Sequence, residues 1–263
     1  MHCIAVDWSG AVSGAASRIW MASARDGALT ALEAPGSREA VCRALLARRA
    51  DPEPVLAGLD FAFGMPAWYV AERGWRDVAE VWRAARDEGE QWLRACEPPF
   101  WGRPGVRRPH DIVAGLRVTE RTTDGVQPKS VFQVGGAGSV GTGSIRGMPM
   151  LLLLREAGWA VWPFDAPSSH TLVEIWPRHF TGPVIKRHAA HRERWLRDRG
   201  TIASDEWIAA MCRSEDAFDA GVAAMGMSRM PIAAILATSR DAVSRIEGAI
   251  CDPRGSQPPD APP

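Results

Sequence analysis

The sequence predicts an α/β domain in which a five-stranded mixed sheet is flanked by helices, and three observations support this. The first sixty residues contain four strand-like segments and one helix-like segment. The first and fourth of these strands are largely apolar, which is typical of central strands buried on both faces. After residue 128, strand and helix patterns alternate again. We therefore expect one domain over residues 1–251.

The first sixty residues give the clearest pattern. Asp26-Gly27 lies between two strand-like segments and predicts a two-residue hairpin. Ser37 precedes an amphipathic stretch and is the expected N-cap of a helix. The elements predicted here are strands at 3–8, 18–25, 28–34 and 54–64 and a helix at 37–49.

Residues 65–128 have a different character, being rich in Pro, Trp and Arg, and they show no clear strand. We interpret them as an insertion over one end of the sheet, with helical pieces around 75–95. Trp75, Val78 and Trp82 fall at helical spacing, which predicts a packing stripe. A platform on which nucleic-acid bases stack is the alternative.

The regular pattern returns at residue 129. Pro149 is expected near the first turn of a helix and Gly158 just after its end. The predicted elements are an extended segment or strand at 129–134, a glycine-rich loop at 135–144, helices at 148–158 and 214–227, strands at 159–165 and 171–178, charged helical segments in 183–213, and a disordered Pro-rich tail at 252–263.

Four acidic residues stand out because their neighbours are apolar. Asp7 and Asp60 each follow an apolar strand, Glu174 lies within LVEIW, and Asp219 lies in a helix almost free of charge. If two parallel strands end together, Asp7 and Asp60 meet at one edge of the sheet. Carboxylates brought together raise each other's pKa unless a cation neutralises them, and oxygen ligands suit Mg²⁺ or Mn²⁺.

Each acidic residue also has a structural explanation. A carboxylate at a strand end can cap a turn, so Asp7 and Asp60 are ambiguous when taken singly. Glu215 and Asp216 follow Ser214 at a helix start, where acidic residues stabilise the helix dipole. Asp219 lies beyond the first turn and shares a helix face with both.

The glycine-rich loop offers a competing hypothesis. Gly136, Gly138 and Gly141 form a G-x-G-x-x-G pattern, and Asp165 lies where a ribose-binding acid would fall in a dinucleotide-binding unit. Pro149 argues against this function, because it predicts a helix that starts several residues after the loop. The hydroxyl groups near the loop could still bind an anion. The candidate phosphate-binding residues are Lys129, Ser139, Thr142, Ser144 and Arg146.

The order of these elements resembles the ribonuclease H-like fold. The motifs IAVDWSGA, LAGLDFAFGMP, SVGTGSIRGMPML, VWPFD, LVEIWPR and SEDAFDAGVAA span residues 4–227. In order and spacing they are similar to domain-of-unknown-function family 429, whose members are described as predicted RNase H-like nucleases related to the RuvC resolvases. The resemblance implies a Mg²⁺ or Mn²⁺ site made by Asp7, Asp60 and Asp219, with Glu174 as a further catalytic acid and Asp216 or Glu215 as a further ligand. It departs from the RuvC-type pattern at Asp60, where that pattern has Glu.

The composition of the chain limits which classes of function are compatible with the sequence. Lys and Arg together number 31, as do Asp and Glu, so any basic surface for nucleic acid must be local. The five cysteines are scattered, and the apolar run MLLLL is too short to cross a membrane. We therefore expect a cytoplasmic, metal-dependent nuclease or phosphodiesterase acting on nucleic acid or another phosphodiester. The alternatives are a non-catalytic binding or regulatory protein and a nucleotide-binding enzyme that uses the glycine-rich loop.

Overall fold

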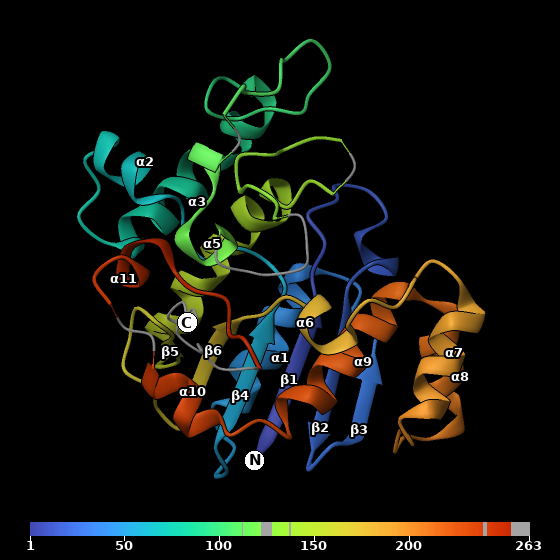
Figure 1. Cartoon of the computed structure of the whole chain (residues 1–263). Helices are drawn as coiled ribbons and strands as arrows, with labels where there is room; N and C mark the ends of the chain where they lie inside the picture. The colour runs from blue at the N-terminus through green and yellow to red at the C-terminus, as the bar shows by residue number, and fades with distance from the viewer. Residues whose placement is uncertain (112, 122–127, 137, 239–240, 254–263) are drawn as a thin grey trace, which may run out of the picture.

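The computed structural model describes residues 1–111, 113–121, 128–136, 138–238 and 241–253. It shows an α/β architecture with a mixed sheet between two layers of helices (Figure 1). Within these residues the sheet has six strands in the order β3-β2-β1-β4-β6-β5. The strands are β1 (His2–Asp7), β2 (Trp20–Arg25), β3 (Ala28–Glu33), β4 (Val55–Leu59), β5 (Ala160–Val161) and β6 (His170–Glu174).

The sheet has one strand more than the five predicted. β5 is a two-residue strand at the edge of the sheet, and it pairs in parallel with β6. The centre of the sheet is parallel, because β1 pairs with β4 and β4 with β6. The N-terminal strands β1, β2 and β3 pair in an antiparallel manner. The carboxyl ends of β1, β4 and β6 consequently lie together at one edge.

Local signals in the first fifty residues are confirmed. Asp26 and Gly27 join β2 to β3 with φ angles of 49° and 81°, the positive values that a tight hairpin turn requires. The Ser37 side chain accepts a hydrogen bond from the Ala40 N–H and caps helix α1 (Arg38–Arg48). These two devices depend on neighbouring residues only, which is why the sequence reveals them.

Helices cover both faces of the sheet. Successive residues along a strand point alternately into two hydrophobic cores: Ile4 and Val6 belong to one, and Cys3 and Ala5 to the other. Helices α1, α3 (Val78–Ala95) and α5 (Gly141–Glu156) contribute to the first core, and α8 (Asp205–Arg213) and α9 (Glu215–Met227) to the second. The other α-helices of the described chain are α2 (Ala67–Glu72), α4 (Val118–Arg121), α6 (Arg178–Thr181), α7 (Ala189–Asp198), α10 (Ile232–Thr238) and α11 (Ser244–Glu247).

The Trp-rich segment packs as a structural element. Val78 and Trp82 are buried on α3, and the Trp82 indole N–H donates to the Phe63 carbonyl oxygen at 2.7 Å. Trp75 precedes the helix and is partly buried. For Trp82, the structure therefore confirms the predicted packing stripe and not the base-stacking platform. Segment 65–128 supplies α3 to the core on this face of the sheet.

After residue 128, two details differ from the expectations. Of the two alternatives for residues 129–134, the strand is not formed: residues 131–132 make a turn, and Gln133 forms a single bridge with Trp101. Helix α5 begins at Gly141, so Pro149 lies inside it. Close packing explains why the first residue of this helix is glycine: a Cβ on Gly141 would lie 2.1 Å from the Val131 carbonyl oxygen. Tertiary packing therefore selects glycine here against its poor helix propensity.

No helix in the described part of the chain is both long and apolar enough to cross a membrane. The prediction of a disordered tail concerns residues 252–263, and all of these except Asp252 and Pro253 lie outside the described residues.

A candidate acidic site at the carboxyl ends of the strands

Asp7 and Asp60 lie side by side, as predicted. Asp7 is the last residue of β1, and Asp60 directly follows β4. The parallel register pairs Val6 with Leu59, and the Asp60 N–H donates to the Val6 carbonyl oxygen at 3.1 Å. Parallel register places both aspartates at the same level of the sheet edge.

Helix α9 brings the third predicted ligand to this edge. Ser214 caps the helix by accepting a hydrogen bond from the Ala217 N–H, and α9 packs across β1 and β2. Asp219 is buried on α9, and its charge raises the pKa of both Asp7 and Asp60. Asp216 lies one turn earlier and adds to the effect on Asp7. We call Asp7, Asp60, Asp216 and Asp219 the aspartate cluster.

The aspartate cluster holds carboxyl groups that favour protonation. Burial is the largest cause that raises the pKa of Asp7 well above its usual range, followed by the negative charges of Asp60 and Asp219. Burial and Asp219 raise the pKa of Asp60 to about 8. The pKa values of Asp216 and Asp219 are also raised, chiefly by burial. A cluster in this state is stabilised by any cation that reaches it.

Lys186 is the basic residue in contact with the aspartate cluster, and our sequence analysis did not identify it. Its ammonium group donates to Asp219 Oδ2. Asp219 Oδ1 is buried and has no hydrogen-bond partner among the described residues. A signal was nevertheless present, because Lys186 and Lys129 are the only lysines among the 31 basic residues of the chain.

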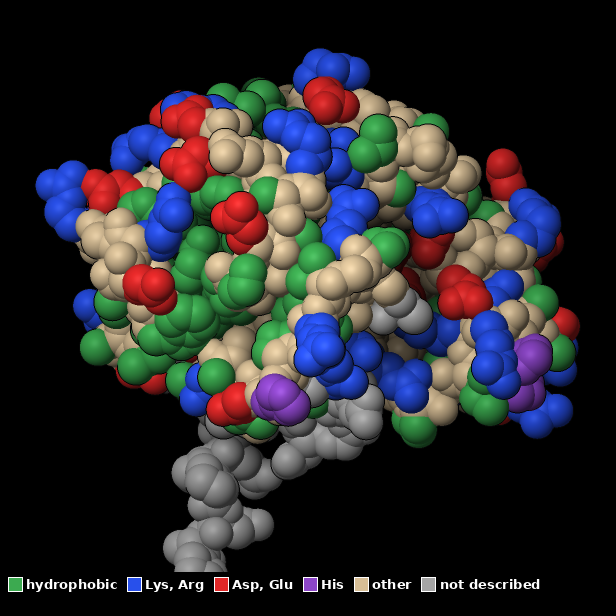
Figure 2. Space-filling view, turned by 90° about the horizontal axis from the view of Figure 1, so that it is seen from above, with side chains coloured by type: hydrophobic (Ala, Val, Ile, Leu, Met, Phe, Trp, Pro, Cys, Tyr) green, Lys and Arg blue, Asp and Glu red, His purple; other side chains and the backbone are tan. Residues whose placement is uncertain are grey.

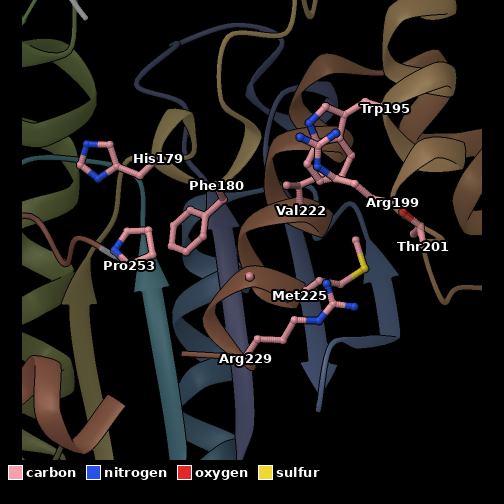
Figure 3. A pocket seen from close by; sticks show the side chains of 10 residues that line it. His179, Phe180, Trp195, Arg199, Thr201, Val222, Met225, Arg229 and Pro253 are labelled. Carbon is pink, nitrogen blue, oxygen red and sulfur yellow. The ribbon is translucent and has the colours of Figure 1, made fainter. Parts of the chain in front are cut away.

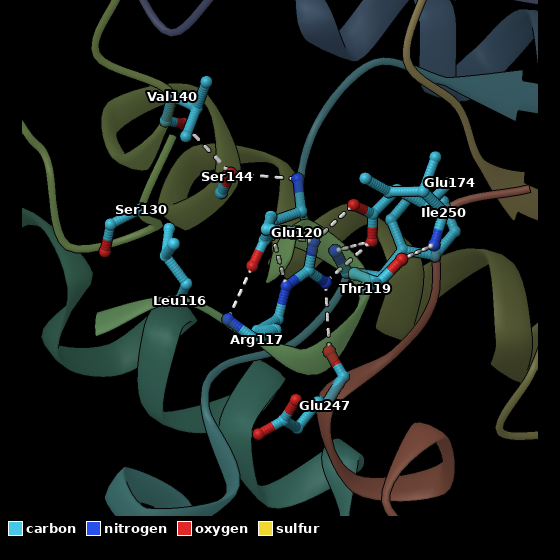
Figure 4. Close-up of polar contacts among 12 residues, drawn as sticks. Leu116, Arg117, Thr119, Glu120, Ser130, Val140, Ser144, Glu174, Glu247 and Ile250 are labelled. Carbon is cyan, nitrogen blue, oxygen red and sulfur yellow. Dashed lines mark hydrogen bonds and ion pairs between the residues drawn. The ribbon is translucent and has the colours of Figure 1, made fainter. Parts of the chain in front are cut away.

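Glu174 lies next to the aspartate cluster but is bonded in a separate, buried ion network (Figure 4). Arg117 donates to Glu174 and to Glu120, and the Phe63 N–H also donates to Glu174, at 2.9 Å. Arg117, Glu120 and Glu174 are all nearly inaccessible to solvent. The Glu247 carbonyl oxygen accepts from Arg117 at 3.0 Å and completes the network.

Bonding partners distinguish Glu174 from the aspartates. Glu174 pairs in register with Leu59, whose side chain belongs to the core under α3 and α5. Asp60 directly follows Leu59 and lines the same pocket as Glu174, but the charge that raises its pKa most is that of Asp219. The Glu174 charge still reaches Asp60 and contributes to its raised pKa.

The five candidate phosphate-binding residues are in different situations. Lys129 lines a pocket of about 80 Å³ together with Asp60 and Glu174. The Thr142 hydroxyl donates to the Val134 carbonyl oxygen. The other three are located as follows: Ser139 precedes α5, Ser144 donates to the Val140 carbonyl oxygen and accepts from the Ala62 N–H, and Arg146 pairs with Glu90 and donates to the Gly10 carbonyl oxygen. Lys129 alone among them lines the pocket that contains an aspartate of the cluster.

The start of α5 at Gly141 removes one objection to dinucleotide binding, because the helix now follows the glycine pattern directly. Two contacts oppose it. The early turns of α5 lie against the 131–134 segment, as the Gly141 approach shows. Asp165, the candidate ribose ligand, forms an ion pair with Arg155 at 2.5 Å and accepts from the Val161 N–H at 3.0 Å.

A second and larger pocket, of about 260 Å³, lies on another side of α9 (Figure 3). Arg199 and Arg229 contribute the charged groups of its lining, and Arg199 stacks over the Trp195 ring at 4.2 Å. None of the lining residues is acidic. This pocket is separate from the aspartate cluster and offers no metal ligands of the carboxylate type.

The donor chemistry of the aspartate cluster fits a hard divalent cation. Its ligands would all be carboxylate oxygens, and the unpartnered Asp219 Oδ1 is an available acceptor. As the side chains stand, however, no group of three or more His, Cys, Asp or Glu residues in the described ranges is arranged to hold a metal ion. Asp219 instead contacts Lys186.

Comparisons with known proteins add no relative. No protein-family model, no curated protein and no solved structure matches the chain.

Proposed function

We propose that this protein is a Mg²⁺- or Mn²⁺-dependent phosphodiester hydrolase of the RNase H-like type, acting on nucleic acid. The observation that carries the proposal is the convergence of Asp7, Asp60 and Asp219, two from the ends of adjacent parallel strands and one from a facing helix. Burial raises the pKa of all three, and neighbouring aspartates raise those of Asp7 and Asp60 further. The resemblance of the sequence motifs to domain-of-unknown-function family 429 implies the same site, although no family model matches the chain.

The residues have distinct roles in this proposal. Asp7, Asp60 and Asp219 would hold the metal, with Asp216 as a further ligand. A divalent ion held there would supply positive charge for activating water and for stabilising the leaving oxygen of a phosphodiester. Lys129 lies in the pocket beside Asp60 and would contact a substrate phosphate. Glu174 is held by Arg117 and so contributes the shape and charge of this pocket.

Local positive charge supports nucleic acid as the substrate. Figure 2 shows the face at the carboxyl ends of the strands, where many Lys and Arg side chains gather. The segment 102–110 carries the exposed residues Arg103, Arg107 and Arg108 and projects beyond these strand ends at the top of Figure 1. Neutralising phosphates with such residues stabilises nucleic-acid binding without reading sequence. A small phosphodiester would leave this segment without a role.

Cleavage by metal-loaded protein tests the proposal. We expect hydrolysis of single-stranded or duplex DNA or RNA with Mn²⁺ or Mg²⁺, and a loss of about 100-fold or more in Asp7→Asn. The matched control is Asp87→Asn, which changes an exposed aspartate on α3 paired with Arg86. Activity that survives in Asp7→Asn, or no activity on any of these substrates with either ion, would refute the assignment.

A non-catalytic binding or regulatory protein is the second candidate. Two observations favour it: Lys186 already bonds to Asp219, and the described side chains do not form a ready metal site. This candidate predicts salt-dependent binding of nucleic acid that is equal with and without Mn²⁺. Binding by the wild type and Asp7→Asn, measured by fluorescence anisotropy in EDTA and in Mn²⁺, separates the two functions.

A further inference from the structure

Lys186 occupies one oxygen of the aspartate cluster while the other oxygen of the same carboxylate has no partner. The ammonium group donates to Asp219 Oδ2, and Asp219 Oδ1 is buried and unpartnered among the described residues. The Lys186 charge also acts on Asp7 and Asp60, where it opposes the mutual repulsion of the aspartates. One lysine thus partly neutralises three carboxyl groups.

A buried arginine anchors the backbone that carries Lys186. Arg192 is buried on α7 and donates to the Lys186 carbonyl oxygen. The same guanidinium donates to the Met211 and Cys212 carbonyl oxygens at the end of α8. Arg192 therefore ties the loop before α7 to α8 and holds the base of the Lys186 side chain near the aspartate cluster.

Lysine and arginine differ in a way that matters at this position. An arginine fork bonds carboxylates in a fixed planar geometry, as Arg117 does with Glu174. A lysine ammonium is a compact charge on a flexible stem and can leave one partner for another. This chain uses arginine almost everywhere, yet lysines lie at Asp219 and in the pocket beside Asp60.

We propose that Lys186 is a tethered cation that competes with the divalent metal for Asp219, so that the aspartate cluster accepts metal only when the ammonium group moves away. This inference rests on the proposed function for the identity of the metal site. It adds a control on metal loading: the protein without metal keeps its acids neutralised by its own side chain, and metal binding releases a positive charge beside the site.

Because the chain has only two lysines, NMR can follow each lysine side chain separately. In protein labelled with ¹³C at lysine Cε, two signals are expected, and Lys129→Met assigns them. Under the proposal, titration with diamagnetic Mg²⁺ shifts the Lys186 signal, because its ammonium leaves Asp219. A Lys186 signal that stays in place while calorimetry shows Mg²⁺ binding would overturn the inference.

Metal affinity provides the second readout. We expect Lys186→Met to bind Mn²⁺ at least about 10-fold more tightly than the wild type and to have a lower Tm without metal. Lys186→Arg should bind Mn²⁺ no more tightly than the wild type, because the charge remains. Arg197→Met is the control for net charge, since it breaks an exposed pair with Glu193 on α7, and it should change the affinity less than twofold. Unchanged or weaker Mn²⁺ binding by Lys186→Met would contradict the inference.

The two proposals fail in different ways. If the wild type binds Mn²⁺ and cleaves nucleic acid while Lys186→Met binds no more tightly, the hydrolase stands and the competition is wrong. If Lys186→Met binds Mn²⁺ and the wild type neither binds nor cleaves, the competition stands and the hydrolase is wrong. If no variant binds Mg²⁺ or Mn²⁺, both are wrong.

Discussion

Two groups of acidic residues lie close together at the carboxyl ends of the strands, and they are neutralised very differently. Glu174 and Glu120 share Arg117, whose guanidinium is fully buried and makes several hydrogen bonds. The aspartate cluster contacts Lys186 through a single carboxylate oxygen. The first group is a satisfied structural network, whereas the second has more negative charge than its bonded partner can balance.

The difference shows which acids are available for chemistry. A buried carboxylate that is bonded to an arginine fork has its oxygens engaged, so it has little capacity left for a metal or a substrate. The aspartates of the cluster remain poorly compensated, and such perturbed groups concentrate at functional sites. Exposure does not distinguish the groups, because Asp7 and Asp219 are 8% exposed and Glu120 is 6% exposed. The bonding partners distinguish the two groups.

The largest effect is expected from removing the cation of the structural network. Arg117→Met leaves Glu120 and Glu174 buried without their partner, and breaking a buried pair in this way costs about 3–5 kcal/mol. Urea denaturation measures the loss. Arg25→Met, which breaks an exposed pair with Glu53, is the control and should cost less than about 1 kcal/mol. A loss in Arg117→Met as small as the control would show that the network is not structural.

Opposite effects on stability are expected from neutralising one acid in each group. Glu174→Gln weakens charge-assisted hydrogen bonds from Arg117 and should cost roughly 1.5–3 kcal/mol. Asp7→Asn removes a charge from a repulsive cluster, so the metal-free protein should be equally stable or more stable. Thermal unfolding of both variants in EDTA tests the contrast. Destabilisation of Asp7→Asn to the same extent as Glu174→Gln would eliminate the distinction.

The sequence reveals the aspartate cluster better than the structural network, and the reason is locality. Asp7 and Asp60 follow apolar strands, and two parallel neighbouring strands bring them together, so strand patterns suffice to predict their meeting. Glu174 also follows this rule at the end of β6, but it bonds to Arg117 instead of joining the aspartates. That partner comes from a distant segment, which a single sequence does not display.

Other features depend on partners that are even less visible. Arg117 has Glu120 three residues away, but no local pattern marks Glu174 as its other partner or Asp219 as the partner of Lys186. The first residue of α5 is Gly141, which has a poor helix propensity but is required by its close approach to the 131–134 segment. Caps and hairpin turns, such as those at Ser37 and Asp26-Gly27, are local and were predicted correctly.

A smaller effect should appear in the pH dependence of stability without metal. The pKa of Asp60 is raised to about 8, so the folded state holds a proton that the unfolded state has lost above pH 4. Stability therefore falls as pH rises from about 4 to about 8 and levels off above that. We expect Tm in EDTA to fall by about 3–6 °C between pH 5 and pH 8, roughly 1–2 kcal/mol.

Asp60→Asn should reduce this slope, whereas Glu174→Gln should leave most of it in place, because Glu174 is only a minor contributor to the Asp60 shift. Differential scanning calorimetry at matched ionic strength measures both. A wild-type Tm that rises steadily from pH 5 to pH 8 would contradict the assigned direction.

The smallest effect is expected at the helix cap that orients the aspartate cluster. The Ser214 hydroxyl accepts a hydrogen bond from the Ala217 N–H at 3.2 Å and so starts the helix that carries Asp216 and Asp219. Ser214→Ala should cost about 1 kcal/mol of stability, the usual value for losing such a cap. Ser204→Ala removes the corresponding cap of α8 and is the matched control. Both variants should lose similar stability, but only Ser214→Ala should weaken Mn²⁺ binding, because α9 carries two aspartates of the cluster and α8 carries none. Equal Mn²⁺ affinity in the two variants, measured by calorimetry, would show that the first turn of α9 does not position the site.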